Sequence, residues 1–151
     1  MLRHAAIAAI VTLAAATGAA AATSQGTPGP DHLVGTRGND RILGRGGDDR
    51  IQGRAGADRL SGGRGDDIIF GDAGNDIVSG GPGNDTLLGG AGRDRITGGT
   101  GHDTIVAGLG KDTVRARDGA VDHITCGPGR DRVIADSQDD VAKDCESVDR
   151  G

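Results

Sequence analysis

A nine-residue unit with glycine and aspartate in fixed places repeats through the middle of this chain. Three consecutive units read GGRGDDIIF at residues 62–70, GDAGNDIVS at 71–79 and GGPGNDTLL at 80–88. Glycine holds the first and fourth places, aspartate the sixth, and a large aliphatic residue the eighth. The register stays clean from residue 35 to residue 115. Such a period predicts a solenoid, in which each unit buries its apolar residue only by stacking on its neighbours.

The sixth and eighth places are conserved in type throughout this region. The sixth place is always aspartate: Asp40, Asp49, Asp58, Asp67, Asp76, Asp85, Asp94, Asp103 and Asp112. The eighth place is always aliphatic: Ile42, Ile51, Leu60, Ile69, Val78, Leu87, Ile96, Ile105 and Val114. Degenerate copies at residues 26–34, 117–125 and 127–135 keep an aspartate and, two residues later, an aliphatic residue: Asp31 and Leu33, Asp122 and Ile124, and Asp131 and Val133. The repeat region therefore takes up most of the chain.

The composition favours a thin aliphatic core over a globular one. Phe70 is the only aromatic residue, and the formal net charge is −5. Without a period, high charge and few large apolar residues would indicate disorder. The 30 glycines follow a nine-residue period rather than a three-residue one, which excludes collagen. We therefore expect a solenoid whose core needs an additional source of stability.

The template G-G-x-G-x-D-x-U-x, with U a large apolar residue, resembles the RTX, or hemolysin-type calcium-binding repeat, family of bacterial proteins. The resemblance implies an all-β fold: a parallel β-roll, or β-solenoid, with two repeats per coil. It also implies calcium ions held between loops that stack on the same side, so that Asp40 shares an ion with the loop of Asp58, and Asp49 with that of Asp67.

The residue types themselves suit calcium. Glycine at the first and fourth places permits positive φ and close backbone approach, which lets a short loop turn its carbonyls toward one point. Aspartate adds an anionic oxygen, and calcium takes six to eight oxygen ligands, many of them carbonyls. Places seven to nine are long enough only for a short strand, with the eighth side chain inward. All nine sixth-place aspartates are therefore candidate calcium ligands, and folding is expected to depend on the ions because stacked carboxylates repel one another.

One alternative is a plain β-solenoid in which aspartate serves only turn chemistry. This alternative is strongest at the two ends. Arg93, His102 and Lys111 stand at the fifth place beside Asp94, Asp103 and Asp112, where Asn or Asp stands in most earlier units. Asp31, Asp122 and Asp131 in the degenerate copies are weaker candidates for calcium ligands.

Residues 1–22 have the pattern of a secretory signal peptide. Arg3 precedes an apolar stretch at residues 5–16, and small residues at 18–22 suit cleavage. The alternative is an uncleaved membrane anchor, although the apolar run is short for spanning. We expect a secreted, extracellular protein with no membrane insertion after cleavage. The predicted organisation is a signal peptide (1–22), a linker and degenerate repeat (23–34), calcium-binding repeats (35–115), degenerate repeats (116–135) and a C-terminal cap (136–151).

The only two cysteines, Cys126 and Cys145, lie near the C-terminus. In an exported protein two cysteines most simply form one disulfide, and the alternative is two free thiols. The tail loses the glycine period. We expect Val141, Cys145 and Val148 to form a small apolar lid on the open end of the solenoid, closed by the disulfide.

Stacking of alternate units sorts the outward side chains onto two sheets that differ. One carries Arg41, Arg59 and Arg95 and is mostly polar and basic, and we interpret its arginines as balancing the aspartates. The other carries an apolar patch of Ile68, Phe70, Leu88 and Val106. Contiguous exposed apolar residues usually mark contacts, so this patch is a candidate for self-association or for a protein partner. The alternative is scattered surface residues of no consequence.

No catalytic constellation is present in the sequence. There is no H-E-x-x-H pattern and no G-x-S-x-G pattern, so we expect no enzyme activity. Aromatic residues that would stack on bases are missing, so no nucleic-acid partner is expected. The favoured function is a secreted calcium-ion-binding repeat protein whose folding is coupled to extracellular calcium. The alternative is a structural or adhesive solenoid that acts through its sheet faces, with calcium only stabilising it.

Overall fold

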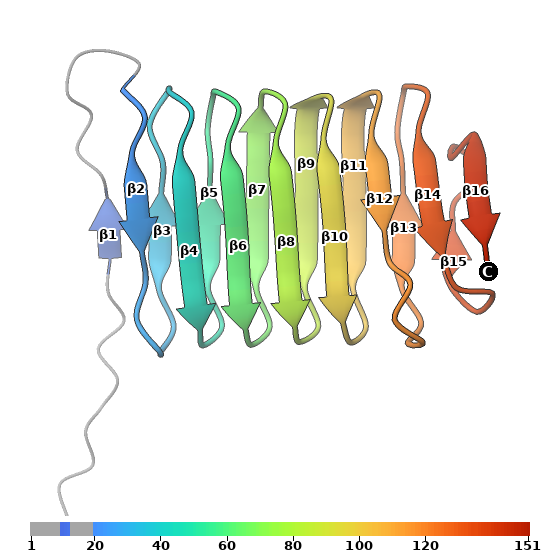
Figure 1. Ribbon diagram of the computed structural model, residues 1–151, viewed down its shortest axis with the longest axis horizontal. Coiled ribbons are helices and arrows are strands. Elements are labelled where there is room, and N and C mark those ends of the chain that lie inside the picture. The colour runs from blue at the N-terminus through green and yellow to red at the C-terminus, as the bar shows by residue number, and fades with distance from the viewer. Residues whose placement is uncertain (1–9, 13–19) are drawn as a thin grey trace, which may run out of the picture.

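The computed structural model describes residues 10–12 and 20–151, so most of the predicted signal peptide lies outside the described residues. The described chain winds into a flattened two-layer solenoid (Figure 1). One sheet contains β1 (Ile10–Thr12), β3 (His32–Val34), β5 (Arg50–Gln52), β7 (Ile68–Ala73), β9 (Thr86–Gly92), β11 (Thr104–Gly110), β13 (His123–Thr125) and β15 (Asp140–Val141). The other contains β2 (Thr23–Gln25), β4 (Arg41–Gly46), β6 (Arg59–Arg64), β8 (Ile77–Pro82), β10 (Arg95–Thr100), β12 (Thr113–Arg115), β14 (Arg132–Ala135) and β16 (Ser147–Arg150).

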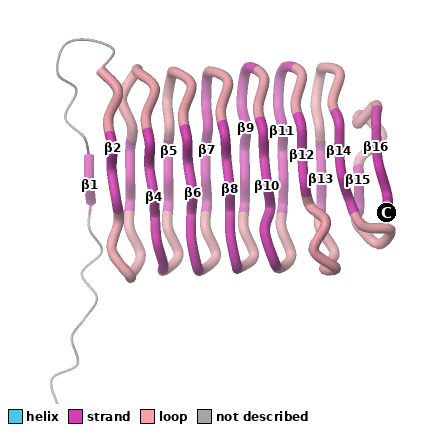
Figure 2. The backbone as a smooth tube through the Cα atoms, in the orientation of Figure 1, coloured by secondary structure: helices cyan, strands magenta, loops and turns pink. Residues whose placement is uncertain are grey.

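Every pairing within the two sheets is parallel, and its register follows the sequence period. Ile51 of β5 pairs with Ile69 of β7, and Leu60 of β6 pairs with Val78 of β8, in each case 18 residues further on. Successive strands alternate between the odd-numbered sheet and the even-numbered sheet, which form separate layers (Figure 2). The prediction of a parallel β-solenoid with two repeats per coil is therefore confirmed.

The core between the two sheets is a double row of eighth-place side chains. From Ile42 to Val114 each of these aliphatic residues has no more than 2% of its surface exposed. Leu33, Ile124 and Val133 continue the rows in the degenerate copies. Complete burial of such a side chain is worth about 1.5–3 kcal/mol. The core is only one side chain deep from each sheet, which leaves little apolar surface to offset the burial of polar groups.

Glycine is required where consecutive coils touch. Gly74, at a fourth place, has φ of +145°, and a Cβ there would lie 1.7 Å from the carbonyl oxygen of Gly56 in the preceding coil. Gly62, at a first place, faces the solenoid interior, and a Cβ there would lie 2.0 Å from Oδ2 of Asp67. The glycines therefore allow the turns to stack closely and leave room beside the sixth-place carboxylates.

The C-terminal tail continues both sheets instead of forming a separate lid. β15 pairs with β13, and β16 pairs with β14. The predicted disulfide between Cys126 and Cys145 is present, with the two Cα atoms 5.2 Å apart. Val141 packs against the core and Cys145 is 9% exposed, but Val148 is 38% exposed. Val148 is thus not part of an apolar lid, because as the eighth-place residue of the last strand it has no following coil to cover it.

The outward faces sort as the repeat pattern predicts. Ile68 and Val106 are 38% and 36% exposed on the odd-numbered sheet, with Phe70 and Leu88 half-buried beside them. The guanidinium of Arg50 stacks over the Phe70 ring at 4.7 Å from its centroid. Whether the patch of Ile68, Phe70, Leu88 and Val106 contacts a partner stays a prediction.

In the described part of the chain, no helix is long and apolar enough to cross a bilayer.

Candidate metal centres along the solenoid edges

The sixth-place aspartates lie in the turns that lead into the strands, so the topology collects them into two ladders, one along each edge of the solenoid. In Figure 1 the turns before the even-numbered strands lie along the upper edge, and those before the odd-numbered strands along the lower edge. The upper ladder contains Asp40, Asp58, Asp76, Asp94, Asp112 and Asp131. The lower ladder contains Asp31, Asp49, Asp67, Asp85, Asp103 and Asp122. All of these side chains are buried, with at most 4% exposed.

One oxygen of each carboxylate holds the preceding coil. The amide of Asp67 donates to Oδ1 of Asp85 at 2.8 Å, and the amide of Asp85 donates to Oδ1 of Asp103 at 2.9 Å. The same bond recurs along both ladders, from the amide of Asp31 to that of Asp112. A hydrogen bond to a carboxylate that satisfies a buried amide stabilises the turn, and here it joins each coil to the next.

The second carboxylate oxygen has no partner in most of the described ladder. Oδ2 is buried and forms no hydrogen bond in ten aspartates: Asp49, Asp58, Asp67, Asp76, Asp85, Asp94, Asp103, Asp112, Asp122 and Asp131. A Cβ added at Gly53 would lie 2.4 Å from Oδ2 of Asp58 and 2.9 Å from the carbonyl oxygen of Gly71. An anionic oxygen and a carbonyl oxygen of the next coil therefore border the same small space. Buried anionic oxygens without donors are the observation expected where a cation completes the site.

Burial also raises the pKa values of these carboxyl groups. The pKa rises to about 7 for Asp67 and Asp76. It rises to about 6 for Asp49, Asp58, Asp85, Asp94, Asp103 and Asp122. Desolvation is the main cause, and the hydrogen bond from the preceding coil offsets it only in part. Repulsion from other acidic side chains, such as Asp85 on Asp67, adds to the rise. The ionised carboxylates of the two ladders therefore destabilise the folded chain, and a proton or a bound cation can remove this destabilisation.

The first aspartate of each ladder, Asp40 or Asp31, has hydrogen bonds that the later aspartates lack. The amide of Thr36 donates to Oδ2 of Asp40 at 2.5 Å, and the Thr36 hydroxyl lies 3.0 Å from Oδ1 and 3.1 Å from Oδ2. Thr27 makes the same amide bond to Asp31 at 2.5 Å. At the second place of every unit from residue 44 to residue 115, φ is positive, as it is at Arg45. Threonine is β-branched and disfavours that conformation, so its amide instead turns toward the carboxylate.

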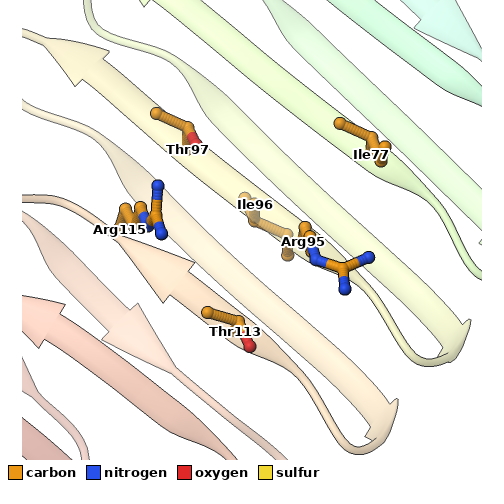
Figure 3. A pocket seen from close by; sticks show the side chains of 6 residues that line it. All are labelled: Ile77, Arg95, Ile96, Thr97, Thr113 and Arg115. Carbon is orange, nitrogen blue, oxygen red and sulfur yellow. The ribbon is translucent and has the colours of Figure 1, made fainter.

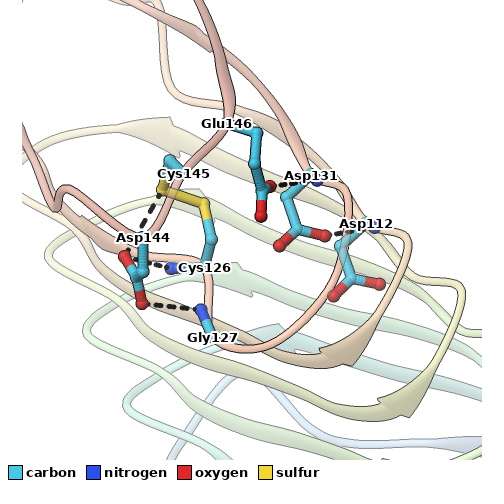
Figure 4. Close-up of a disulfide and its surroundings, with 7 residues drawn as sticks. All are labelled: Asp112, Cys126, Gly127, Asp131, Asp144, Cys145 and Glu146. Carbon is cyan, nitrogen blue, oxygen red and sulfur yellow. Dashed lines mark hydrogen bonds between the residues drawn. A yellow bond between two sulfur atoms is a disulfide. The ribbon is translucent and has the colours of Figure 1, made fainter.

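Two acidic residues of the tail complete the ladders at the C-terminal end, and sequence reasoning missed both. The amide of Asp131 donates to Oε2 of Glu146 at 2.8 Å, and the amide of Asp122 donates to Oδ1 of Asp139 at 3.1 Å. Figure 4 shows Asp112, Asp131 and Glu146 in line beside the disulfide. Glu146 follows Cys145 directly, so the disulfide fixes the residue next to the final carboxylate. The spacing from Asp131 to Glu146 is 15 residues rather than 18, which conceals the relation.

The fifth-place residues form a second, exposed ladder of opposite direction. Oδ1 of Asp66 accepts from the amide of Asn84 at 2.7 Å, and Oδ1 of Asn84 accepts from the amide of His102 at 2.9 Å. Here the acceptor belongs to the earlier coil, whereas the sixth-place acceptor belongs to the later coil. Asp and Asn perform this role equally. At Arg93 and Lys111 the side chain provides no such acceptor, whereas Nδ1 of His102 lies 3.3 Å from the amide nitrogen and 3.0 Å from the carbonyl oxygen of Val121 in the next coil. Asp94, Asp103 and Asp112 keep their places in the sixth-place ladder.

The geometry suits a hard cation held mainly by backbone oxygens. Among the described residues no three His, Cys, Asp or Glu side chains converge as a metal site built from side chains would require. Calcium accepts carboxylate and carbonyl oxygens together in flexible geometry. The ten unpartnered Oδ2 atoms and the carbonyls beside them fit calcium, and a bound ion would supply the positive charge that the buried carboxylates lack.

The comparisons with known proteins agree with this geometry. The family model of the RTX calcium-binding nonapeptide repeat matches in four copies, at residues 25–60, 52–87, 79–114 and 88–121. Neither the curated proteins nor the solved structures gave a match. Taken together, the four copies span residues 25–121, well over half of the chain, and include ten of the twelve buried aspartates of the two ladders. The chain belongs to the RTX calcium-binding nonapeptide repeat family.

Proposed function

We propose that this chain is an exported calcium-binding protein in which several ions occupy the two edge ladders and drive folding. The observation that carries the proposal is the row of ten buried aspartates with an unpartnered Oδ2. In each of them the neighbouring coil satisfies Oδ1, so the free oxygen is held in place before any ion binds. The proposed ligands are Asp49, Asp58, Asp67, Asp76, Asp85, Asp94, Asp103 and Asp112 of the regular units, together with Asp122 and Asp131.

The free-energy cost of the buried, ionised carboxylates is large enough to couple folding to calcium. A carboxyl group whose pKa rises from 3.8 to about 6, as for Asp85, costs the folded state roughly 3 kcal/mol when ionised at neutral pH. Two to five such groups equal the whole net stability of an ordinary domain, about 5–15 kcal/mol. A thin core cannot offset the eight groups whose pKa is raised to about 6 or 7. Calcium binding removes the penalty, so its binding free energy becomes folding free energy.

The direct test is far-UV circular dichroism of the mature chain during a calcium titration at pH 7.5, with magnesium as the control ion. We expect little β signal in chelator, and a cooperative gain near the 10⁻⁴–10⁻³ M calcium typical of extracellular modules. Magnesium should be far less effective because it requires near-ideal octahedral geometry. Full β structure in chelator at this pH, unchanged by calcium, would contradict the proposal.

We further propose that the ladder of bound ions begins at Asp49, because Thr36 and Thr27 already satisfy Oδ2 of Asp40 and Asp31. The substitution Thr36→Gly should permit positive φ at residue 36 and release Oδ2 of Asp40. The calcium stoichiometry measured by equilibrium dialysis should then rise by one ion. Thr100→Gly, which makes the same change at an exposed third place, is the control and should leave the stoichiometry unchanged. An unchanged count in Thr36→Gly would show that the threonine does not close the ladder.

Export is supported by two independent features. Residues 1–22 have the pattern of a secretory leader. The disulfide between Cys126 and Cys145 persists in oxidising compartments and is rare in the cytosol. Calcium at the concentrations that weak sites need is also available outside the cell. These features support an extracellular location, where the ladders would fill as the chain leaves the cell.

A further inference from the structure

The outward face of the even-numbered sheet carries unpaired positive charge. Its exposed arginines stand at seventh and ninth places of β4, β6, β10, β12 and β14: Arg41, Arg59, Arg95, Arg115 and Arg132. Among the described residues, none of these guanidinium groups forms an ion pair or hydrogen bond. The ion pairs of this part of the chain join Arg117 to Asp149 and His123 to Asp140. These arginines therefore do not pair with the sixth-place aspartates, which are buried at the edges, and their role in balancing that charge stays a prediction.

Strand register arranges these arginines along the solenoid axis. Arg41 pairs with Arg59 on neighbouring strands, Arg95 pairs with Thr113, and Thr97 pairs with Arg115. No acidic residue occupies a seventh or ninth place between β4 and β14. Between β4 and β14, this face of a chain with a net charge of −5 thus exposes only positive charge at its seventh and ninth places. Such segregation gives an electrostatic surface that attracts anions.

Two shallow hollows lie on this face, one on each side of Ile77. One, of about 260 Å³, is lined by Arg41, Arg59, Ser61, Ser79 and Ile77 with two further leucines. The other, of about 250 Å³, is lined by Arg95, Arg115, Thr97, Thr113 and Ile77 above Ile96. Figure 3 shows the second hollow, with Ile96 behind the strand and the polar side chains on the near side. Each hollow combines two arginines, two hydroxyls and the apolar side chain of Ile77, which is 40% exposed.

We propose that this face, from β4 to β12, binds a linear acidic polysaccharide. Arginine pairs in a bidentate manner with carboxylate or sulfate groups. Serine and threonine hydroxyls can donate to and accept from sugar hydroxyls. Ile77 offers an apolar surface to the face of a sugar ring. The hollows are two strand spacings apart, about 10 Å, so one extended chain can occupy both and repeat its contacts.

Nucleic acid fits this surface less well. Proteins that bind single strands without sequence preference stack bases on aromatic side chains. Phe70 is the only aromatic residue of the chain, and it lies on the opposite sheet. The surface offers guanidinium and hydroxyl groups together with one aliphatic side chain. This set matches a polymer of sugar hydroxyls and regularly spaced anions.

The test uses the full mature chain in saturating calcium, with isothermal titration of dextran sulfate and carboxymethyl-dextran as probes and unmodified dextran as the control. Both charged polymers should bind, more weakly at higher salt, and dextran should not. Arg59→Gln with Arg95→Gln should lower the affinity at least tenfold. Arg50→Gln with Arg93→Gln, an equal change of charge elsewhere on the surface, should lower it less than twofold. Circular dichroism in calcium verifies that both variants are folded.

Each other result would overturn the proposal. Equal losses in the two double variants would show attraction to net charge without a defined face. Binding of unmodified dextran at comparable strength would show that the arginines are not required. Oligothymidine that binds as tightly as dextran sulfate, and that loses affinity with Arg59→Gln and Arg95→Gln, would identify a nucleic-acid surface instead. Failure of both charged polymers to bind the parent would leave the face without this partner.

Discussion

In chelator at pH 8, Asp67→Asn should make the chain more stable, whereas in saturating calcium the same substitution should make it less stable. Asparagine keeps the Oδ1 acceptor for the amide of Asp49. It also removes a buried charge whose pKa is raised to about 7. The gain without calcium is expected to be roughly 4 kcal/mol. In calcium the variant loses an anionic ligand, which should cost about 3 kcal/mol, the magnitude typical of a buried ion pair that loses one partner.

The neighbouring residue provides a matched control. Asp66 is exposed at a fifth place, where its Oδ1 accepts from the amide of Asn84, and asparagine occupies the same place in other units. Asp66→Asn should therefore change stability little in either condition. Stability in chelator is measured as the concentration of trimethylamine oxide needed to induce folding, and stability in calcium by urea unfolding. A change of the same sign in both conditions for Asp67→Asn would rule out a calcium ligand at Asp67.

Acid should replace calcium as the agent of folding. Ladder carboxyl groups with pKa values raised to about 6 or 7 are protonated more readily in the folded chain than in the unfolded chain, where the value is 3.8. Stability from this difference is fully present below about pH 4 and is lost as pH rises through 6 to 7. In chelator we expect β structure at pH 4 and its cooperative loss between pH 5.5 and 7.5, a window set by those pKa values.

Calcium should add less stability as pH falls through the same window. Protons already neutralise the ladder carboxylates of the folded chain, so the calcium midpoint measured by circular dichroism should move to lower concentration as pH falls from 7.5 to 5.5. Light scattering at each pH excludes aggregated β structure as the source of the signal. A chelated chain that stays unfolded at pH 4, or a calcium midpoint that does not respond to pH, would show that these carboxylates are not the coupled groups.

The repeat pattern was sufficient to predict most of the fold. Places one, four, six and eight recur at one period, and each has a single structural use, so the start of each strand, the aliphatic core and the two edge ladders followed directly. The expectation of strands confined to places seven to nine is wrong for β4 and for β6 to β11, which continue into the first places of the next unit because the glycine-rich turns stack in register. The coil of 18 residues was implied by the resemblance and is seen in the pairing of Ile51 with Ile69. The disulfide followed from counting cysteines in a chain that was expected to be exported. In each case a pattern visible along the sequence is enough to place the residues, although the contacts that form join residues 18 or 19 positions apart.

What the sequence did not reveal depends on the backbone path. Oδ2 of Asp40 accepts a hydrogen bond from the amide of Thr36 because φ at Thr36 is not positive, and the period of the pattern does not show this. Asp139 and Glu146 enter the ladders only because loops of irregular length bring them there. Asp122 and Asp131 looked weak in degenerate units, yet each has an unpartnered Oδ2 like the regular rungs. The irregular ends therefore require the three-dimensional structure.

The register of 18 residues also determines how such a chain can change length. Duplication of one nine-residue unit would move every later strand to the opposite sheet, placing Arg95 and Arg115 beside the Phe70 side of the solenoid and splitting both edge ladders. Duplication of two units adds a whole coil and leaves each face and each ladder continuous. Gene duplications within this repeat should thus persist in even numbers of units, which makes the coil, and not the nonapeptide, the unit of inheritance.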